Sequence, residues 1–286
     1  MTEKLGFVTF PTTFENYKWY KPILVFIIGV IIYNILNLII SIPFDIVYGE
    51  QFITSIMNGG YEASNNAIGE IYSDLIVIVM IPSLYIASKI VKDRPFSSYV
   101  SSRGGWNYKL YLKALVIPFV IMIIFEGIDI AFNGSEGSNH FSIGYFIICL
   151  ILVPLQCIAE EYVFRGLIMQ TFGSWFKIPV LAVILQAILF AALHGYNNLG
   201  NISIFISGLI FGIIAWKTNG IEVSSAIHTV NNLVITMTVM FGLSLNSSTI
   251  EISDFLLSTL IDVIIFAAVY YVGMKTNWFG EIKEDT

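Results

Sequence analysis

Long apolar runs separated by short polar segments dominate the pattern of this chain. Eight of them are candidates for helices that cross or enter a membrane, which takes about 20 mostly apolar residues. They lie at residues 20–42, 71–91, 110–132, 142–172, 179–194, 201–216, 221–242 and 252–274. The pattern therefore predicts an all-α fold, a polytopic membrane protein with about eight transmembrane helices.

The polar ends of the chain divide it into three predicted parts. A cytoplasmic N-terminal segment (1–19) and a cytoplasmic tail (275–286) flank one integral membrane domain (20–274). The first apolar run is too long for a cleaved signal peptide, and no small-residue cleavage site follows it. We therefore expect this run to be a retained membrane anchor.

Composition agrees with a chain whose solvent is the lipid bilayer. Hydrophobic residues make up 56% and charged residues 12%, whereas soluble domains carry about 25% charged residues. The net charge of −6 and the lack of a basic patch argue against a nucleic-acid partner. Cys149 and Cys157 share one apolar run and are too few for a disulfide framework, so we expect them to be buried.

Lysines and arginines predict the orientation, because cytoplasmic loops of membrane proteins carry an excess of them. All of the 14 except Arg165 fall at the two ends of the chain or in alternate loops, which an eight-span model places on one side. The pattern therefore predicts a multi-pass protein of the cell membrane with both termini in the cytoplasm.

Three charged residues interrupt one of the most hydrophobic parts of the chain. A charge at the bilayer centre costs at least ~2.5–3.5 kcal/mol on insertion scales. Glu161 and Arg165 are four residues apart, so they share a helix face and are expected to form an internal ion pair. Glu160 lies about 100° around the helix and has no basic neighbour there. An unpaired intramembrane carboxylate indicates function, and Glu160 is a candidate general base.

Other polar side chains are predicted at depths similar to that of Glu160. Counted from the cytoplasmic helix ends, Glu160 and His194 lie ~18 and ~22 Å deep, and His228 and Asn232 lie ~10 and ~16 Å deep. His228 and Asn232 share a face, and Asn231 competes with Asn232 for the same role. We therefore expect these groups to share one cavity.

Taken together, these residues form three spaced motifs. They are EExxxR at Glu160, Glu161 and Arg165, FxxxH at Phe190 and His194, and HxxxN at His228 and Asn232. In this order, on separate predicted spans within residues 155–235, they resemble the motifs of the CPBP family. This family of CAAX proteases and bacteriocin-processing enzymes, also called Abi, is related to the type 2 CAAX prenyl endopeptidases.

The resemblance implies an intramembrane endopeptidase acting on a peptide or membrane-protein substrate; it names no partner protein. By that resemblance, Glu160 activates a water molecule that His194 helps to hold. His228 and Asn232 stabilise the oxyanion, and Glu161 and Arg165 support the geometry. The chemistry agrees, because peptide hydrolysis needs a base near the water and donors where negative charge develops.

A metal is the alternative to a purely glutamate-based mechanism. Glu160, His194 and His228 form a plausible zinc set with water in the fourth position. The chain has no HExxH motif, the usual helical signature of a zinc protease. We favour the glutamate type with no cofactor and keep zinc as the alternative.

Two other functions compete with proteolysis. The chain could be a non-enzymatic membrane scaffold, or a bacteriocin immunity or regulatory protein that retains the motifs. It could also be a proton-coupled transporter that uses Glu160, the histidines and Asp262, which has no predicted partner. Transporters often show internal repeats, and the absence of a clear one here disfavours transport.

Overall fold

The computed structural model describes residues 6–59, 66–135, 137–245 and 247–279. Within these ranges the regular elements are helices, no β-strand is present, and one isolated β-bridge joins Ser101 and Gly220. The α-helices are α1 (Lys21–Tyr48), α2 (Glu50–Gly59), α3 (Ala67–Ile78), α4 (Met80–Val91), α5 (Tyr108–Asn133), α6 (Ile143–Glu161), α7 (Gln170–Phe176), α8 (Pro179–Ala192), α9 (Asn198–Lys217), α10 (Glu222–Met240) and α11 (Ile252–Lys275). Shorter elements are the 3₁₀-helices η1 (Phe7–Thr13) and η3 (Phe96–Tyr99) and the π-helix η4 (Tyr162–Met169). The predicted all-α fold is confirmed. Residues 1–5 of the predicted N-terminal segment and 280–286 of the predicted tail lie outside the described residues.

Local chemistry explains where several helices begin and end. Side-chain oxygens accept a backbone N–H at the starts of α3, α5, α6 and α9, from the caps Asn66, Asn107, Ser142 and Asn197. Pro82 has no N–H to donate to Ile78, the last residue of α3, which accounts for the interruption between α3 and α4.

Six helical stretches in the described ranges are long and apolar enough to cross a membrane. They are Lys21–Tyr48, Ala67–Val91, Tyr108–Phe132, Ile143–Phe176, Asn198–Lys217 and Ile252–Lys275. Each matches one of the predicted runs. The predicted run 179–194 is the shorter apolar helix α8, and the run 221–242 is α10. The count of eight transmembrane helices stays a prediction.

The low apolar content of α10 follows from its place in the bundle. This helix packs against α5, α6 and α9. It buries most of its side chains, including the polar residues Ser224, Ser225, His228 and Thr229. A helix enclosed by other helices meets little lipid, so polar residues can line it where they find partners.

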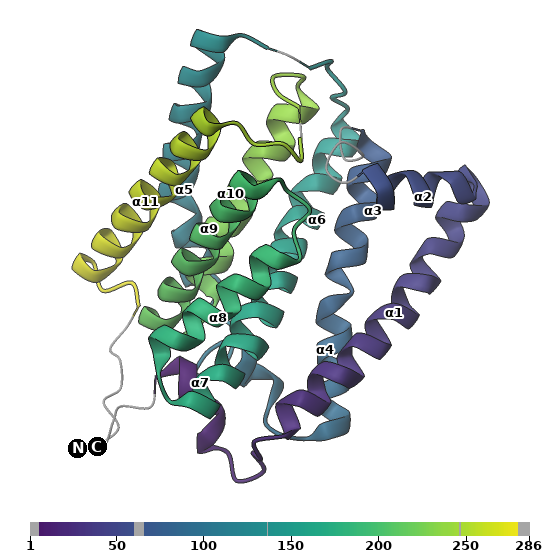
Figure 1. Ribbon diagram of the computed structural model, residues 1–286. Coiled ribbons are helices and arrows are strands. Elements are labelled where there is room, and N and C mark those ends of the chain that lie inside the picture. The colour runs from purple at the N-terminus through teal and green to yellow at the C-terminus, as the bar shows by residue number, and fades with distance from the viewer. Residues whose placement is uncertain (1–5, 60–65, 136, 246, 280–286) are drawn as a thin grey trace.

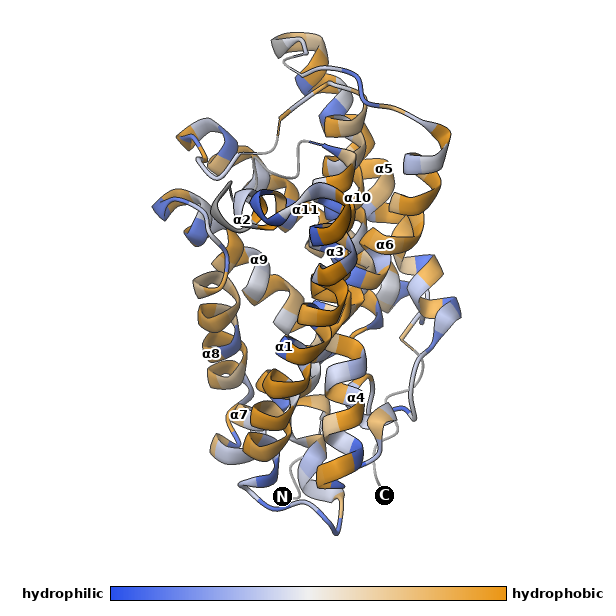
Figure 2. Cartoon of the chain, turned by 90° about the vertical axis from the view of Figure 1, so that its right-hand side faces the viewer, coloured by the Kyte–Doolittle hydropathy of each residue, from blue (hydrophilic) through white to orange (hydrophobic). Residues whose placement is uncertain are grey.

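The opposite environment surrounds α1, whose side chains are mostly outside the bundle. Ile31, Leu38 and Ile46 are all exposed, and few residues of this helix are buried. Figure 2 shows hydrophobic residues along much of α1 and α8, with hydrophilic residues gathered mainly at the turns. A surface of this kind matches lipid, in which apolar side chains have no reason to be buried.

Basic residues gather at one end of the bundle. In Figure 1 the start of α1 and the ends of α4 and α7 lie together at the lower end. There Lys21 Nζ donates to the backbone oxygen of Lys92 at 3.3 Å. Arg103, in the loop before α5, forms an ion pair with Glu222 at the start of α10, with 2.7 Å between Nη2 and Oε2. The basic loops thus share one end, as their alternation along the chain predicts.

The N-terminal segment is packed against this end. Phe7 and Val8 of η1 are buried in a cluster with Met169, Ala182 and Ile221. Gly173 of α7 lies against Val8 so closely that an added Cβ would overlap the Val8 backbone oxygen. Segment 6–13 is therefore part of the packed bundle.

Gly173→Ala should destabilise the protein, because the new methyl group must push η1 away from α7. Overpacking of this kind costs about 1–3 kcal/mol, which can be measured as the free energy of unfolding in detergent. Gly127→Ala in α5 is the matched control, since no described atom lies within 4 Å of its added Cβ. Equal stability of the two variants would contradict the close packing.

Candidate active site

The charged cluster lies where α6 continues as a π-helix. α6 starts after its cap Ser142 and ends at Glu161, and η4 follows directly from Tyr162. In a π-helix the backbone hydrogen bonds join residues five apart, a wider turn that is frequent at functional sites. Glu160 and Glu161 therefore occupy the last turn of regular helix, and Arg165 lies in the π-helix. All three are buried.

The predicted ion pair between Glu161 and Arg165 is present. Arg165 Nη1 donates to Glu161 Oε1 at 2.9 Å, and both side chains are 0% exposed. Ser224 Oγ donates to the other oxygen, Glu161 Oε2, at 2.7 Å. Arg165 Nη2 donates to the backbone oxygen of Gly208 at 3.3 Å, and the guanidinium lies 4.4 Å from the ring centroid of Phe190. The pair therefore joins η4 and α6 to α8, α9 and α10.

His228 lies between the two adjacent carboxylates. Its Nδ1 is 3.2 Å from Glu161 Oε1, and its Nε2 is 3.5 Å from Glu160 Oε2. The ring stacks on Phe211, with centroids 5.0 Å apart and an angle of 24° between the planes. A paired carboxylate such as Glu161 only accepts hydrogen bonds, so Nδ1 of His228 carries a proton, and Nε2 faces Glu160.

Glu160 has one bonded oxygen and one free oxygen. Gln156 Nε2 donates to Glu160 Oε1 at 2.8 Å. Oε2 is buried and accepts no hydrogen bond from the described residues. Gln156 was not among the predicted site residues, although its position four residues before Glu160 places both on one helix face. That spacing is the signal that could have identified it.

Asn232 is the asparagine that faces the carboxylate. Its Nδ2 donates to Gln156 Oε1 at 3.2 Å and lies 3.5 Å from His228 Nε2. Asn231 instead donates from Nδ2 to Asn232 Oδ1 at 3.2 Å. The structure thus brings Glu160, His228 and Asn232 together, with Gln156 between the first and the last.

His194 lies next to this group without bonding to it. α8 ends at Ala192, so His194 stands just past the helix, where its Nδ1 is 2.6 Å from the backbone oxygen of Phe190. The Phe190 ring contacts His194 with centroids 4.6 Å apart and His228 with centroids 6.0 Å apart. Phe190 therefore packs beneath the imidazole of His194, as the FxxxH spacing predicts, and links it to the site.

Asp262 has a partner that the sequence did not indicate. Ser207 Oγ, from α9, donates to Asp262 Oδ2 at 2.5 Å. One turn away, the hydroxyl groups of Ser203 and Ser258 are 3.2 Å apart. These contacts between α9 and α11 account for a carboxylate midway along α11 as an interhelical hydrogen bond.

A buried arginine outside the predicted site holds the far end of the π-helix. Arg94 Nη2 donates to the backbone oxygen of Gly166 at 3.1 Å, and Nη1 donates to Gln170 Oε1 at 2.6 Å. The guanidinium lies 3.9 Å from the ring centroid of Tyr99, whose O–H donates to Asp93 at 3.1 Å. Burial raises the pKa of Tyr99 above its ordinary value, so this hydroxyl stays a donor.

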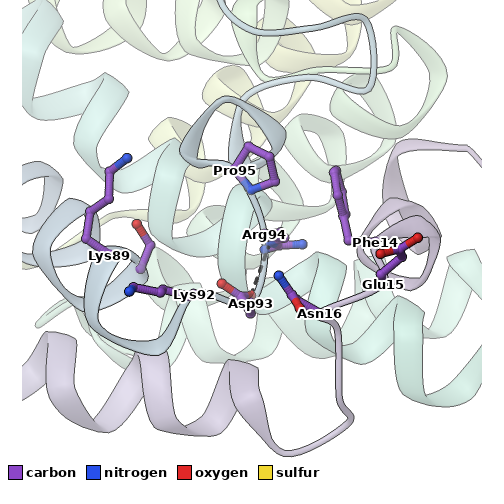
Figure 3. A pocket seen from close by; sticks show the side chains of 9 residues that line it. Phe14, Glu15, Asn16, Lys89, Lys92, Asp93, Arg94 and Pro95 are labelled. Atoms are coloured by element: carbon purple, nitrogen blue, oxygen red, sulfur yellow. Dashed lines mark ion pairs between the residues drawn. The ribbon is translucent and has the colours of Figure 1, made fainter.

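Arg94 also forms part of the wall of a hollow at the basic end of the bundle, shown in Figure 3. The hollow has a volume of ≈ 520 Å³ and is lined by Phe14, Glu15, Asn16, Ser88, Lys89, Lys92, Asp93, Arg94 and Pro95. None of the predicted site residues lines it. The hollow and the carboxylate cluster are therefore separate features.

The zinc alternative requires three ligands to meet at one point. Glu160 and His228 approach each other, but His194 makes no hydrogen bond or ion pair with either among the described side chains. Across the described ranges no group of three or more His, Cys, Asp or Glu is arranged to hold a metal ion. The set does not fit zinc in this conformation, and we derive no step through a metal.

The motif-bearing region is similar to known proteins. Residues 142–234 match the family model for type II CAAX prenyl endopeptidase Rce1-like proteins. All three motifs lie within this range, so the predicted family resemblance is confirmed there. The uncharacterized protein YyaK of Bacillus subtilis (strain 168) is 32% identical over 178 residues, which cover 58% of this chain and 59% of YyaK. No solved structure matches the chain.

Arg165→Met should destabilise the protein strongly, because it leaves Glu161 buried without its cation. Breaking a buried pair in this way costs about 3–5 kcal/mol in the free energy of unfolding. Adding Glu161→Gln to this variant should recover part of the loss by removing the uncompensated charge. Lys275→Met, which removes an exposed cation at the end of α11, is the control and should change stability by at most about 0.5 kcal/mol. A similar loss in both single variants would contradict the stabilising role of the Glu161–Arg165 ion pair.

Proposed function

We propose that this protein is an intramembrane endopeptidase of the CAAX-protease type, hydrolysing peptide bonds of membrane-associated peptides or proteins. The observation that carries the proposal is the free oxygen of Glu160. Oε2 is buried, receives no hydrogen bond from the described residues and faces His228 Nε2 at 3.5 Å. The match of residues 142–234 to an endopeptidase family model supports the same reaction.

Glu160 is the proposed general base. Its Oε2 accepts a proton from a water molecule while the water oxygen attacks the carbonyl carbon of the scissile peptide. A C–O bond forms, and the electron pair of the carbonyl π bond moves to oxygen. Gln156 already occupies Oε1, so Oε2 is the oxygen available to the water. A positioned base of this kind contributes about 10²–10⁴-fold to rate.

His228 and Asn232 are the proposed donors to the oxyanion. The Nε2 of His228 and the Nδ2 of Asn232 lie 3.5 Å apart, so both can approach one oxygen atom. In this proposed role the His228 ring carries a proton on each nitrogen, because Nδ1 donates to Glu161 and Nε2 can donate only if it is also protonated. Preorganised donors stabilise the charge that develops there. When the intermediate collapses, the C–N bond breaks and Glu160 returns its proton to the leaving amine. Acid and amine are then free to leave.

Glu161 and Arg165 act as supports. Glu161 accepts a hydrogen bond from Nδ1 of His228, which fixes the direction of the ring, and Arg165 neutralises Glu161. His194 is proposed to help hold the water. The support for this role is that Phe190 contacts both imidazoles, which leaves His194 beside His228.

The multiple apolar helices indicate a multi-pass membrane protein. Its proposed site is the cell membrane, with the N- and C-terminal ends in the cytoplasm. The clustering of Lys21, Lys92 and Arg103 at one end of the bundle supports this orientation. Lipid therefore surrounds the cleavage site, and a substrate must reach it from the membrane or from its surface.

Glu160→Gln should abolish peptide cleavage by the protein reconstituted in vesicles. The amide keeps the shape of the side chain but cannot take a proton, so kcat should fall about 10²–10⁴-fold. Asn232→Ala removes an oxyanion donor and should lower kcat about 10²–10³-fold. The assay is release of peptide fragments, followed by mass spectrometry.

His140→Ala is the control for these variants. His140 is exposed, and its ring nitrogen bonds the hydroxyl of Ser138 at 2.7 Å, outside the site. Cleavage should be unchanged. If a cellular phenotype of the protein survives both Glu160→Gln and His194→Ala, the protein is a scaffold or an immunity factor rather than a protease.

Exhaustive chelation of the purified protein should leave cleavage unchanged, because the proposed mechanism uses only protein side chains and water. Elemental analysis of the active preparation should then show far less than one zinc per chain. The metal-free mechanism would be wrong if the preparation held stoichiometric zinc and if activity were lost on zinc removal and restored on its return.

A further inference from the structure

Gln156 connects two residues that have separate proposed roles. It lies on α6, one turn before Glu160, and is 9% exposed. Its Nε2 donates to Glu160 Oε1 at 2.8 Å, and its Oε1 accepts from Asn232 Nδ2 at 3.2 Å. The thiol of Cys157 donates to the same Oε1 at 3.2 Å. One carboxamide thus spans from the base on α6 to the oxyanion donor on α10.

The chemistry of the three groups fixes their orientations. An ionised carboxylate only accepts hydrogen bonds, so Gln156 must turn its NH₂ group towards Glu160. Its carbonyl oxygen then faces Asn232, which must donate a hydrogen bond from its own NH₂ group. Asn231 donates to Asn232 Oδ1, which agrees with this orientation. The charge of Glu160 therefore determines which way the Asn232 amide points.

This orientation leaves the useful atoms of both partners free. Glu160 has one oxygen bound to Gln156 and the other, Oε2, open to a water molecule. Asn232 Nδ2 carries two hydrogens, and only one is needed for Gln156. The second lies on the side of His228, where Nε2 is 3.5 Å from Nδ2 and where the oxyanion is proposed to form.

We propose that Gln156 is a positioning residue that couples the base Glu160 to the oxyanion donor Asn232. The inference rests on the proposed function. It proposes that a residue outside all three motifs sets the distance between the base Glu160 and the oxyanion donor Asn232. The proposed role of Gln156 is indirect, through its hydrogen bonds to Glu160 and Asn232. It acts by holding the Glu160 carboxylate and the Asn232 amide at a separation set by one rigid, planar amide group.

Gln156→Leu tests the coupling, since leucine fills much of the same space and forms no hydrogen bond. Loss of positioning should lower kcat about 10- to 100-fold, because misplacement of the order of 1 Å can cost about 10²-fold in rate. KM should change little, since the proposed role of Gln156 is to position Glu160 and Asn232 and not to bind substrate. Thr236→Val is the matched control, because it removes a half-buried hydrogen bond one turn beyond Asn232, to Glu70 Oε1 at 3.0 Å. The control should keep kcat.

Gln156→Glu gives a second readout that a merely structural role would not move. Two carboxylates in contact cannot both stay ionised, and a protonated Glu at position 156 regains a donor towards Glu160. The ratio of its kcat to that of the wild type should therefore rise as pH is lowered. Glu160, Cys157, His228 and the neighbouring Asp74 of α3 are present in both proteins, so the ratio isolates position 156.

The outcomes separate this inference from the proposed function. If the wild type cleaves, Glu160→Gln is inert and Gln156→Leu keeps the wild-type kcat, then the coupling is wrong and the protease stands. If Gln156→Leu fails to fold, as thermal unfolding in detergent would show, a pH-independent ratio for Gln156→Glu overturns the coupling. If the wild type and Glu160→Gln are equally inert towards peptides, the proposed function fails and the coupling fails with it.

Discussion

Glu161 and Arg165 bury opposite charges one helical turn apart, and the geometry of the surrounding helices follows from the need to satisfy them. Charges removed from water are tolerated only when they are paired and when their remaining hydrogen-bonding positions are filled. Ser224 and His228 of α10 fill the positions on Glu161, and the Gly208 carbonyl of α9 fills one on Arg165. An arrangement that stabilises the pair therefore also places His228.

The same constraint gives two adjacent glutamates different environments. Glu161 is 0% exposed and surrounded by a guanidinium, an imidazole and a hydroxyl, so both of its oxygens accept hydrogen bonds. Glu160, the next residue along the helix, faces Gln156 and keeps one oxygen free. Two neighbouring carboxyl groups with different surroundings can take different roles in a site. Here the difference in surroundings results from the 100° between successive residues of a helix.

Much of the fold could be predicted from the pattern of apolar residues. Each predicted run corresponds to one helix or to two or three consecutive helical elements, because length and hydropathy depend only on local sequence. The break between α3 and α4 was not predicted, although Pro82 marks it. The packing of Phe7 and Val8 against α7 was also missed, since a short 3₁₀-helix has no periodic signature. The packing also depends on a close contact with Gly173, which is far away in the sequence.

The site divides in the same way. Spacing along one helix sufficed for the Glu161–Arg165 pair and for the contact between Phe190 and His194, because residues four apart share a face. Helix lengths also placed Glu160, His228 and Asn232 at compatible depths. Only the tertiary structure decided that His228 lies between both carboxylates, that Gln156 bridges Glu160 to Asn232 and that Asp262 meets Ser207. These contacts join different helices, and their existence depends on how each helix is rotated about its axis, which packing sets and local sequence does not.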